Sequence, residues 1–262
     1  MMRRTALVIS LLLAMLACLP GFVTATQIEV RGAVNAPGVR QLHDHARLSD
    51  AALAAGVQID AYMLGAAWFR PALLVEQQRL RAGLLFDIES LHLNALKEDR
   101  SELIELSASL GSWLQTLPAT GRQVALLDPR AIEVTPAANR PVADGDVLYY
   151  PRRPTSIRVV GAVKQSCELP LVALQDARLY LEACPASRLA DPDRVFIVQP
   201  DGRVFEQGIG LWNRSHPMPL APGAVVFVPL NESSVRGVAP DLNAELAAFL
   251  ATQPPAQSDE HP

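Results

Sequence analysis

The sequence predicts an α+β protein that contains two copies of one small module, the first interrupted by a helical insertion. Residues 28–34 (IEVRGAV) match residues 157–163 (IRVVGAV) at five of seven positions, at an offset of 129. Residues 142–151 match residues 220–229 at an offset of 78. The offsets differ by 51, so the first copy holds about 51 residues that the second lacks. The surplus has the leucine spacing of helices.

The elements of each copy predict the same small fold. The first copy starts with a β-hairpin that turns at Pro37-Gly38, a pair typical of type II turns. A short helix follows at residues 50–55, with Ser49 as its expected cap. Each copy closes on an apolar strand that ends at proline, residues 147–151 and 225–229. A hairpin, a crossing helix and a closing strand predict ubiquitin-like β-grasp domains at residues 26–153 and 154–231.

The second copy shows the same order with different local sequences. Ser166-Cys167 stands where the first copy has Pro-Gly, so this turn must be built differently. A strand is expected at residues 194–199, with a turn at 200–203. Its crossing helix is predicted from apolar residues on one helical face: Leu171, Leu174, Ala177 and Leu181.

The surplus segment predicts an antiparallel helical hairpin at residues 71–118. Pro71 opens the first helix, Pro118 stops the second, and residues 97–100 form a polar turn. We expect the hairpin to protrude from the first domain. Its two apolar stripes are Leu80, Leu84, Ile88, Leu91 and Leu103, Leu106, Leu110, Trp113, Leu117.

The two ends of the chain carry further signals. Residues 240–251 predict a short amphipathic helix whose Leu242, Leu246 and Phe249 should dock, and residues 252–262 predict a disordered tail. Residues 1–25 have the basic start, apolar run and small terminal residues of a signal peptide, which predicts export to the periplasm. The less favoured alternative is a lipoprotein signal with Cys18 as the lipidated residue. No other apolar stretch is long enough to span a membrane.

Charge and cysteine content restrict the function of the mature chain. Without Arg3 and Arg4, 21 basic and 27 acidic residues remain, a net charge of −6. With no basic stripe, nucleic acid and anionic membrane surfaces are poor partners. The remaining cysteines, Cys167 and Cys184, are an even pair in an oxidising compartment and predict a disulfide. A metal or redox pair is the alternative, but their spacing fits neither CxxC nor a zinc pattern.

Several segments resemble known families. Gly-Ala-Val after a strand, and residues 190–193 before another, resemble the soluble-ligand-binding β-grasp units of outer-membrane polysaccharide export proteins. From about residue 27 to 250 the chain resembles the GfcC type of capsule-biosynthesis protein. The resemblance implies tandem β-grasp domains, a helical hairpin in the first, a terminal amphipathic helix and a periplasmic role beside polysaccharide secretion machinery, without an established activity. The segments that carry it are residues 120–123, 145–152, 198–202, 211–213 and 221–224.

Two residues are candidates for ligand binding. Arg122 follows the hairpin directly, where its guanidinium could face a groove and bind an acidic sugar or carboxylate. The alternative is an arginine that pins the hairpin through helix-end carbonyls. Trp212 could stack on a sugar ring, or could be half-buried in packing.

The sequence gives little support for catalysis. Residues 43–45 (HDH) do not form a complete metal site, and Glu102 and Glu105 are expected on a solvated helix face. No nucleophile motif, P-loop or dinucleotide fingerprint occurs, and no cofactor is expected. We therefore expect a non-catalytic periplasmic accessory protein of capsule or exopolysaccharide biosynthesis, which binds export machinery, extended polysaccharide or both. The alternative is a periplasmic polysaccharide-processing enzyme, which would need paired carboxylates in a cleft.

Overall fold

The computed structural model describes residues 25–255. The predicted signal peptide, its alternative lipidation site at Cys18 and most of the predicted disordered tail lie outside these residues. Residues 252–255, which begin that tail, are described and contact the rest of the chain. Within the described part, no helix combines the length and apolar character needed to cross a bilayer.

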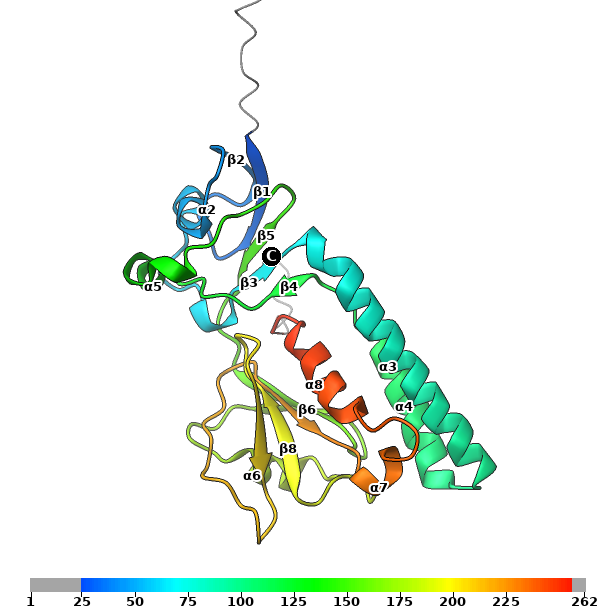
Figure 1. The fold of residues 1–262 in the computed structure, drawn as a ribbon. Helices are drawn as coiled ribbons and strands as arrows, with labels where there is room; N and C mark the ends of the chain where they lie inside the picture. Colours follow the sequence, from blue (N-terminus) through cyan, green and yellow to red (C-terminus); the bar gives the residue numbers. More distant parts are fainter. Residues whose placement is uncertain (1–24, 256–262) are drawn as a thin grey trace, which may run out of the picture.

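The chain forms two five-stranded sheets in tandem, one above the other in Figure 1. The first has the order β2-β1-β5-β3-β4 and the second the order β7-β6-β10-β8-β9, which is the same order strand for strand. In each sheet the first strand pairs in parallel with the last, and the other pairs are antiparallel. The predicted fold of two β-grasp domains is therefore confirmed. The strands are β1 (Thr26–Gly32), β2 (Gly38–Leu42), β3 (Ala67–Phe69), β4 (Arg122–Gln123), β5 (Val147–Tyr150), β6 (Ser156–Gly161), β7 (Cys167–Pro170), β8 (Arg194–Val198), β9 (Val204–Gly208) and β10 (Val225–Val228).

The repeated Gly-Ala-Val has a structural cause. Gly32 has a φ of +88°, and a Cβ there would lie 2.1 Å from the carbonyl oxygen of Tyr150 at the end of β5. Gly161 is its counterpart, with a φ of +103° and 2.3 Å to the carbonyl oxygen of Val228. Only glycine fits where the first strand of each sheet passes so close to the closing strand.

The first crossing helix is longer than predicted and the second is shorter. Helix α2 spans Leu48–Ala55 and its N-cap is Arg47, whose amide donates a hydrogen bond to Asp50. The predicted cap at Ser49 is therefore wrong, because Ser49 lies within the first turn of the helix. Helix α6 (Ala177–Ala183) is capped by Asp176. The predicted helical positions of Leu171 and Leu174 are wrong, because Leu174 has a φ of +60° and is exposed. Two further short helices, α5 (Pro129–Val134) and α7 (Glu232–Val235), and 3-10 turns at Met63–Gly65 and Pro136–Ala138 complete the connections.

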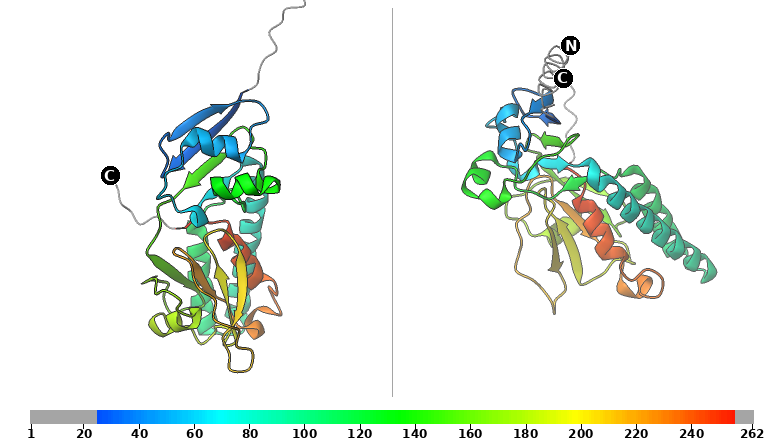
Figure 2. Two further views of the ribbon diagram at one scale, coloured as in Figure 1. Left: turned by 90° about the vertical axis from the view of Figure 1, so that its left-hand side faces the viewer. Right: turned by 45° about the horizontal axis from the view of Figure 1, so that its top comes forward.

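The insertion is an antiparallel pair of helices between β3 and β4, as predicted. Helix α3 spans Pro71–Lys97 and helix α4 spans Ser101–Thr116. Buried residues of both helices share one apolar core with the second sheet, while the first sheet has a separate core. The hairpin therefore starts in the first domain but lies along the second (Figures 1 and 2) instead of protruding freely.

Helix α8 (Leu242–Ala251) fills the space between the hairpin and the second sheet, where it contacts α3, β8 and β9. It is the red helix beside α3 in Figure 1. Leu242, Leu246 and Phe249 are fully buried, which confirms that this helix docks on the body of the protein. Burial of three such side chains contributes roughly 1.5–3 kcal/mol each, enough to hold a ten-residue helix.

Candidate functional site

Arg122 lies on β4 with only 5% of its surface exposed. Its guanidinium donates hydrogen bonds to the carbonyl oxygens of Gln253 (2.8 Å), Ala251 (3.3 Å), Ala66 (3.4 Å) and Pro200. Burial lowers the pKa of Arg122 to about 10, which the carboxylate of Asp201 partly opposes. Two of these carbonyls lie at or just beyond the end of α8, so Arg122 binds the end of the terminal helix and does not pin the hairpin through its helix-end carbonyls.

The hairpin is held at the same place by a different residue. Gln77 of α3 is buried, donates to the carbonyl oxygen of Arg122 (2.9 Å) and accepts from the amide of Gly121 (2.7 Å). Thr120 donates to the carbonyl oxygen of Thr252 beyond α8 (2.7 Å). Residues 120–122 therefore join both helical elements to the first sheet.

Trp212 lies on a turn after β9 and leaves 78% of its surface exposed, so it is not half-buried. Its indole Nε1 donates to Oδ1 of Asp193 (2.9 Å), which orients the ring. Asp193 directly precedes β8, whereas Pro200, the contact of Arg122, follows it. Because a five-residue strand spans roughly 17 Å, Arg122 and Trp212 lie at opposite ends of β8 and do not form one site.

Cys167 and Cys184 form the predicted disulfide, with their Cα atoms 6.0 Å apart. The bond joins the start of β7 to the end of α6. Next to the disulfide, the connection between β6 and β7 pairs through backbone hydrogen bonds with the segment that follows α6. Lys164 donates its amide to the carbonyl of Pro185 (3.1 Å), and Ser187 donates its amide to the carbonyl of Ala162 (2.9 Å). The disulfide thus fastens two paired segments of the second domain.

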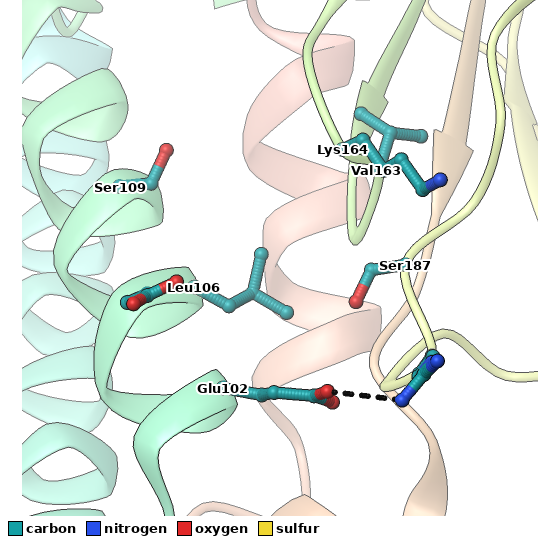
Figure 3. A pocket seen from close by; sticks show the side chains of 8 residues that line it. Glu102, Leu106, Ser109, Val163, Lys164 and Ser187 are labelled. Atoms are coloured by element: carbon teal, nitrogen blue, oxygen red, sulfur yellow. Dashed lines mark ion pairs between the residues drawn. The ribbon is translucent and has the colours of Figure 1, made fainter.

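These paired segments form one wall of a cleft with a volume of about 430 Å³, which we call the α4 cleft (Figure 3). The wall from the second domain presents Val163, Lys164, Ser187 and Arg188. The facing wall is one side of helix α4 and presents Glu102, Glu105, Leu106 and Ser109. The periodicity of three and four along α4 places these four residues on the same side.

Charge is divided between the two walls of the α4 cleft. Both carboxylates stand on α4, and both cations stand on the second domain. Glu102 and Arg188 approach to 3.5 Å across the opening, as the dashed line in Figure 3 marks. Both side chains are largely exposed, at 57% and 88%, so this ion pair is weak.

A smaller cavity of about 40 Å³ continues the cleft along α4. It shares Ser109, Val163 and Lys164 with the α4 cleft and adds the half-buried ring of Trp113. From Glu102 to Trp113 the helix rises by about 16 Å. The combined surface is an elongated groove with hydroxyl and charged groups at one end and an aromatic ring at the other. Such surfaces suit an extended, hydroxyl-rich ligand.

The family follows from comparison with known sequences. The model for the N-terminal region of capsule biosynthesis GfcC proteins matches residues 27–153, and the model for their C-terminal region matches residues 165–255. The chain belongs to the capsule biosynthesis GfcC family. It is also 26% identical over 196 residues to the uncharacterized protein YjbG of Escherichia coli (strain K12), covering 73% of this chain and 79% of YjbG.

The two GfcC regions meet at the α4 cleft. The α4 wall lies in the N-terminal region, while Ser187 and Arg188 lie in the C-terminal region. Membership of the family assigns the chain to capsule or exopolysaccharide production. The cleft is therefore a feature that needs both halves of a GfcC protein.

Sequence reasoning did not find this site. Glu102 and Glu105 were expected on a solvated face, and they are exposed, but that face borders the cleft. Lys164 and Arg188 lie in connections without any motif. The one available signal was the missing Pro-Gly at Ser166-Cys167, which marks the connection that forms the wall.

The histidines of residues 43–45 do not form a metal site. His43 lies 3.5 Å from Asp50 and His45 lies 3.2 Å from Asp44. Among residues 25–255, no group of three or more His, Cys, Asp or Glu residues is placed to hold a metal.

Proposed function

We propose that this GfcC protein is a non-catalytic periplasmic accessory of capsule or exopolysaccharide biosynthesis and export, which holds an extended polysaccharide in the α4 cleft. The observation that carries the proposal is the groove itself, with Ser109 and Ser187 on facing walls and Trp113 at its end. The signal-like sequence at residues 1–25 and the Cys167–Cys184 disulfide support a periplasmic address.

The arrangement of acids in the cleft favours binding over hydrolysis. Glycosidases generally place two carboxyl groups on either side of the bond that they cleave. Here Glu102 and Glu105 both stand on the α4 wall, and the facing wall carries Lys164 and Arg188. A sugar between the walls would meet carboxylates from one side only. That geometry supports a holding role.

Substitution of one small residue in the cleft tests the proposal. Ser109→Trp should fill the groove and weaken binding of purified surface polysaccharide at least about tenfold, equivalent to about 1.4 kcal/mol. Ser112→Trp is the matched control, because Ser112 is also exposed on α4 but lines a different groove, between α3 and α4. Binding is measured by titration calorimetry, and surface polymer is measured in a deletion strain complemented with each variant.

Two results would contradict the proposal. Equal binding and equal surface polymer with Ser109→Trp and Ser112→Trp would show that the α4 cleft is not used. Cleavage of the polymer by the purified protein, abolished by Glu102→Gln or Glu105→Gln, would identify a processing enzyme instead.

A further inference from the structure

The charges of the α4 cleft are balanced as well as divided. Glu102 and Glu105 on one wall face Lys164 and Arg188 on the other, so the formal charges of the lining sum to zero. The helix backbone holds the two acids one turn apart. The paired segments beside the disulfide hold the two cations.

Each wall offers only one kind of hydrogen-bonding group at its charged positions. A carboxylate only accepts hydrogen bonds, and lysine and arginine only donate them. A sugar hydroxyl both donates and accepts. A neutral sugar ring between the walls can therefore donate to Glu105 and accept from Lys164, while Ser109 and Ser187 adapt to either role.

An acidic sugar fits the same cleft less well. Its carboxylate would be attracted by Lys164 or Arg188, but it would share the cleft with the carboxylates of Glu102 and Glu105. Repulsion from these two carboxylates opposes the attraction by the two cations. The net charge of −6 on the mature chain adds further repulsion at low salt.

We propose that the α4 cleft binds an uncharged stretch of saccharide chain and discriminates against sugars that carry carboxylate or phosphate groups. The inference rests on the proposed function and specifies its ligand. Trp113 then supplies an apolar face for a sugar ring at the end of the groove, about 16 Å along α4 from Glu102. The charged residues orient hydroxyl groups and do not neutralise a polyanion.

Salt dependence tests the charge of the bound segment. The probe is the surface polysaccharide of the producing strain, cut into oligosaccharides and titrated into the full exported protein at about 20 mM and about 500 mM NaCl. A neutral segment should bind with a Kd that changes less than about twofold between these conditions, because screening acts only on charged partners. Glu105→Lys, which makes the lining net positive, should give no gain in affinity. Ser109→Trp should weaken the observed binding at least about tenfold.

The other outcomes separate this inference from the proposed function. Binding that weakens about tenfold or more at high salt, or that strengthens about tenfold with Glu105→Lys, would show an anionic ligand and overturn the inference while leaving the proposed function intact. Salt-independent binding that Ser109→Trp does not affect would place the ligand elsewhere and overturn the use of the cleft. Absence of binding in both salts would overturn the proposed function and this inference with it.

Discussion

Arg122 donates hydrogen bonds to backbone carbonyls from three segments that are far apart in the sequence. Ala66 precedes β3, Pro200 begins the turn between β8 and β9, and Ala251 ends α8. Burial of a cation costs free energy unless its donors are satisfied, and these carbonyls provide the compensation. Arg122 therefore ties the first sheet, the second sheet and the terminal helix together.

Arg122→Ala should lower the free energy of unfolding by about 2–4 kcal/mol, because charge-assisted hydrogen bonds are lost and buried carbonyls are left unsatisfied. Urea unfolding followed by circular dichroism measures the change. Arg130→Ala is the control, since Arg130 is exposed on α5, and it should change stability by less than about 0.5 kcal/mol. An Arg122→Ala protein of full stability that no longer bound polysaccharide would mean that Arg122 contacts the ligand.

At the scale of elements, the wall of the cleft depends on two connections and one covalent bond. The segments around Lys164 and Ser187 pair through backbone hydrogen bonds, and Cys167–Cys184 closes a loop with a sequence separation of 17 residues. The disulfide therefore positions the basic wall as well as stabilising the domain.

Replacement of both Cys167 and Cys184 by serine should lower the free energy of unfolding by roughly 3 kcal/mol in the chain-entropy description. Binding of polysaccharide should weaken in parallel, because the wall that carries Lys164 loses its tether. Urea unfolding and calorimetry measure the two effects, and Ser166→Ala serves as the control. Quantitative labelling of both thiols in the unreduced exported protein would contradict the account.

The elements also show what local sequence can and cannot predict. The repeat identified both β-grasp units, because a glycine that passes close to the closing strand must recur in each copy. Leucine spacing identified α3, α4 and α8, because an amphipathic helix must bury one apolar stripe. Leucine spacing also predicted a helix at Leu171 and Leu174, but these residues lie in an irregular segment before α6. Apolar residues at helical spacing do not by themselves require a helix. Helix α5 was missed because it is six residues long.

At the scale of the whole molecule, the candidate site arises from how the inserted hairpin leans on the second domain. Buried residues of α3 and α4 join the core of the second sheet, and α8 lies between the hairpin and that sheet (Figure 2). This packing brings Glu105 within reach of the same cleft as Lys164, although they are far apart in the sequence. The angle of a hairpin depends on long-range packing, so sequence periodicity identifies the helices but not the cleft that they form.

Amide NMR spectra recorded during titration with purified surface oligosaccharide show directly whether the α4 cleft holds polysaccharide. We expect the largest chemical-shift changes on both walls, at Ser109 and Trp113 of α4 and at Lys164, Ser187 and Arg188 of the second domain. We expect little change at the exposed turn around Trp212. Changes confined to that turn, or an unaltered spectrum at saturating oligosaccharide, would contradict the claim.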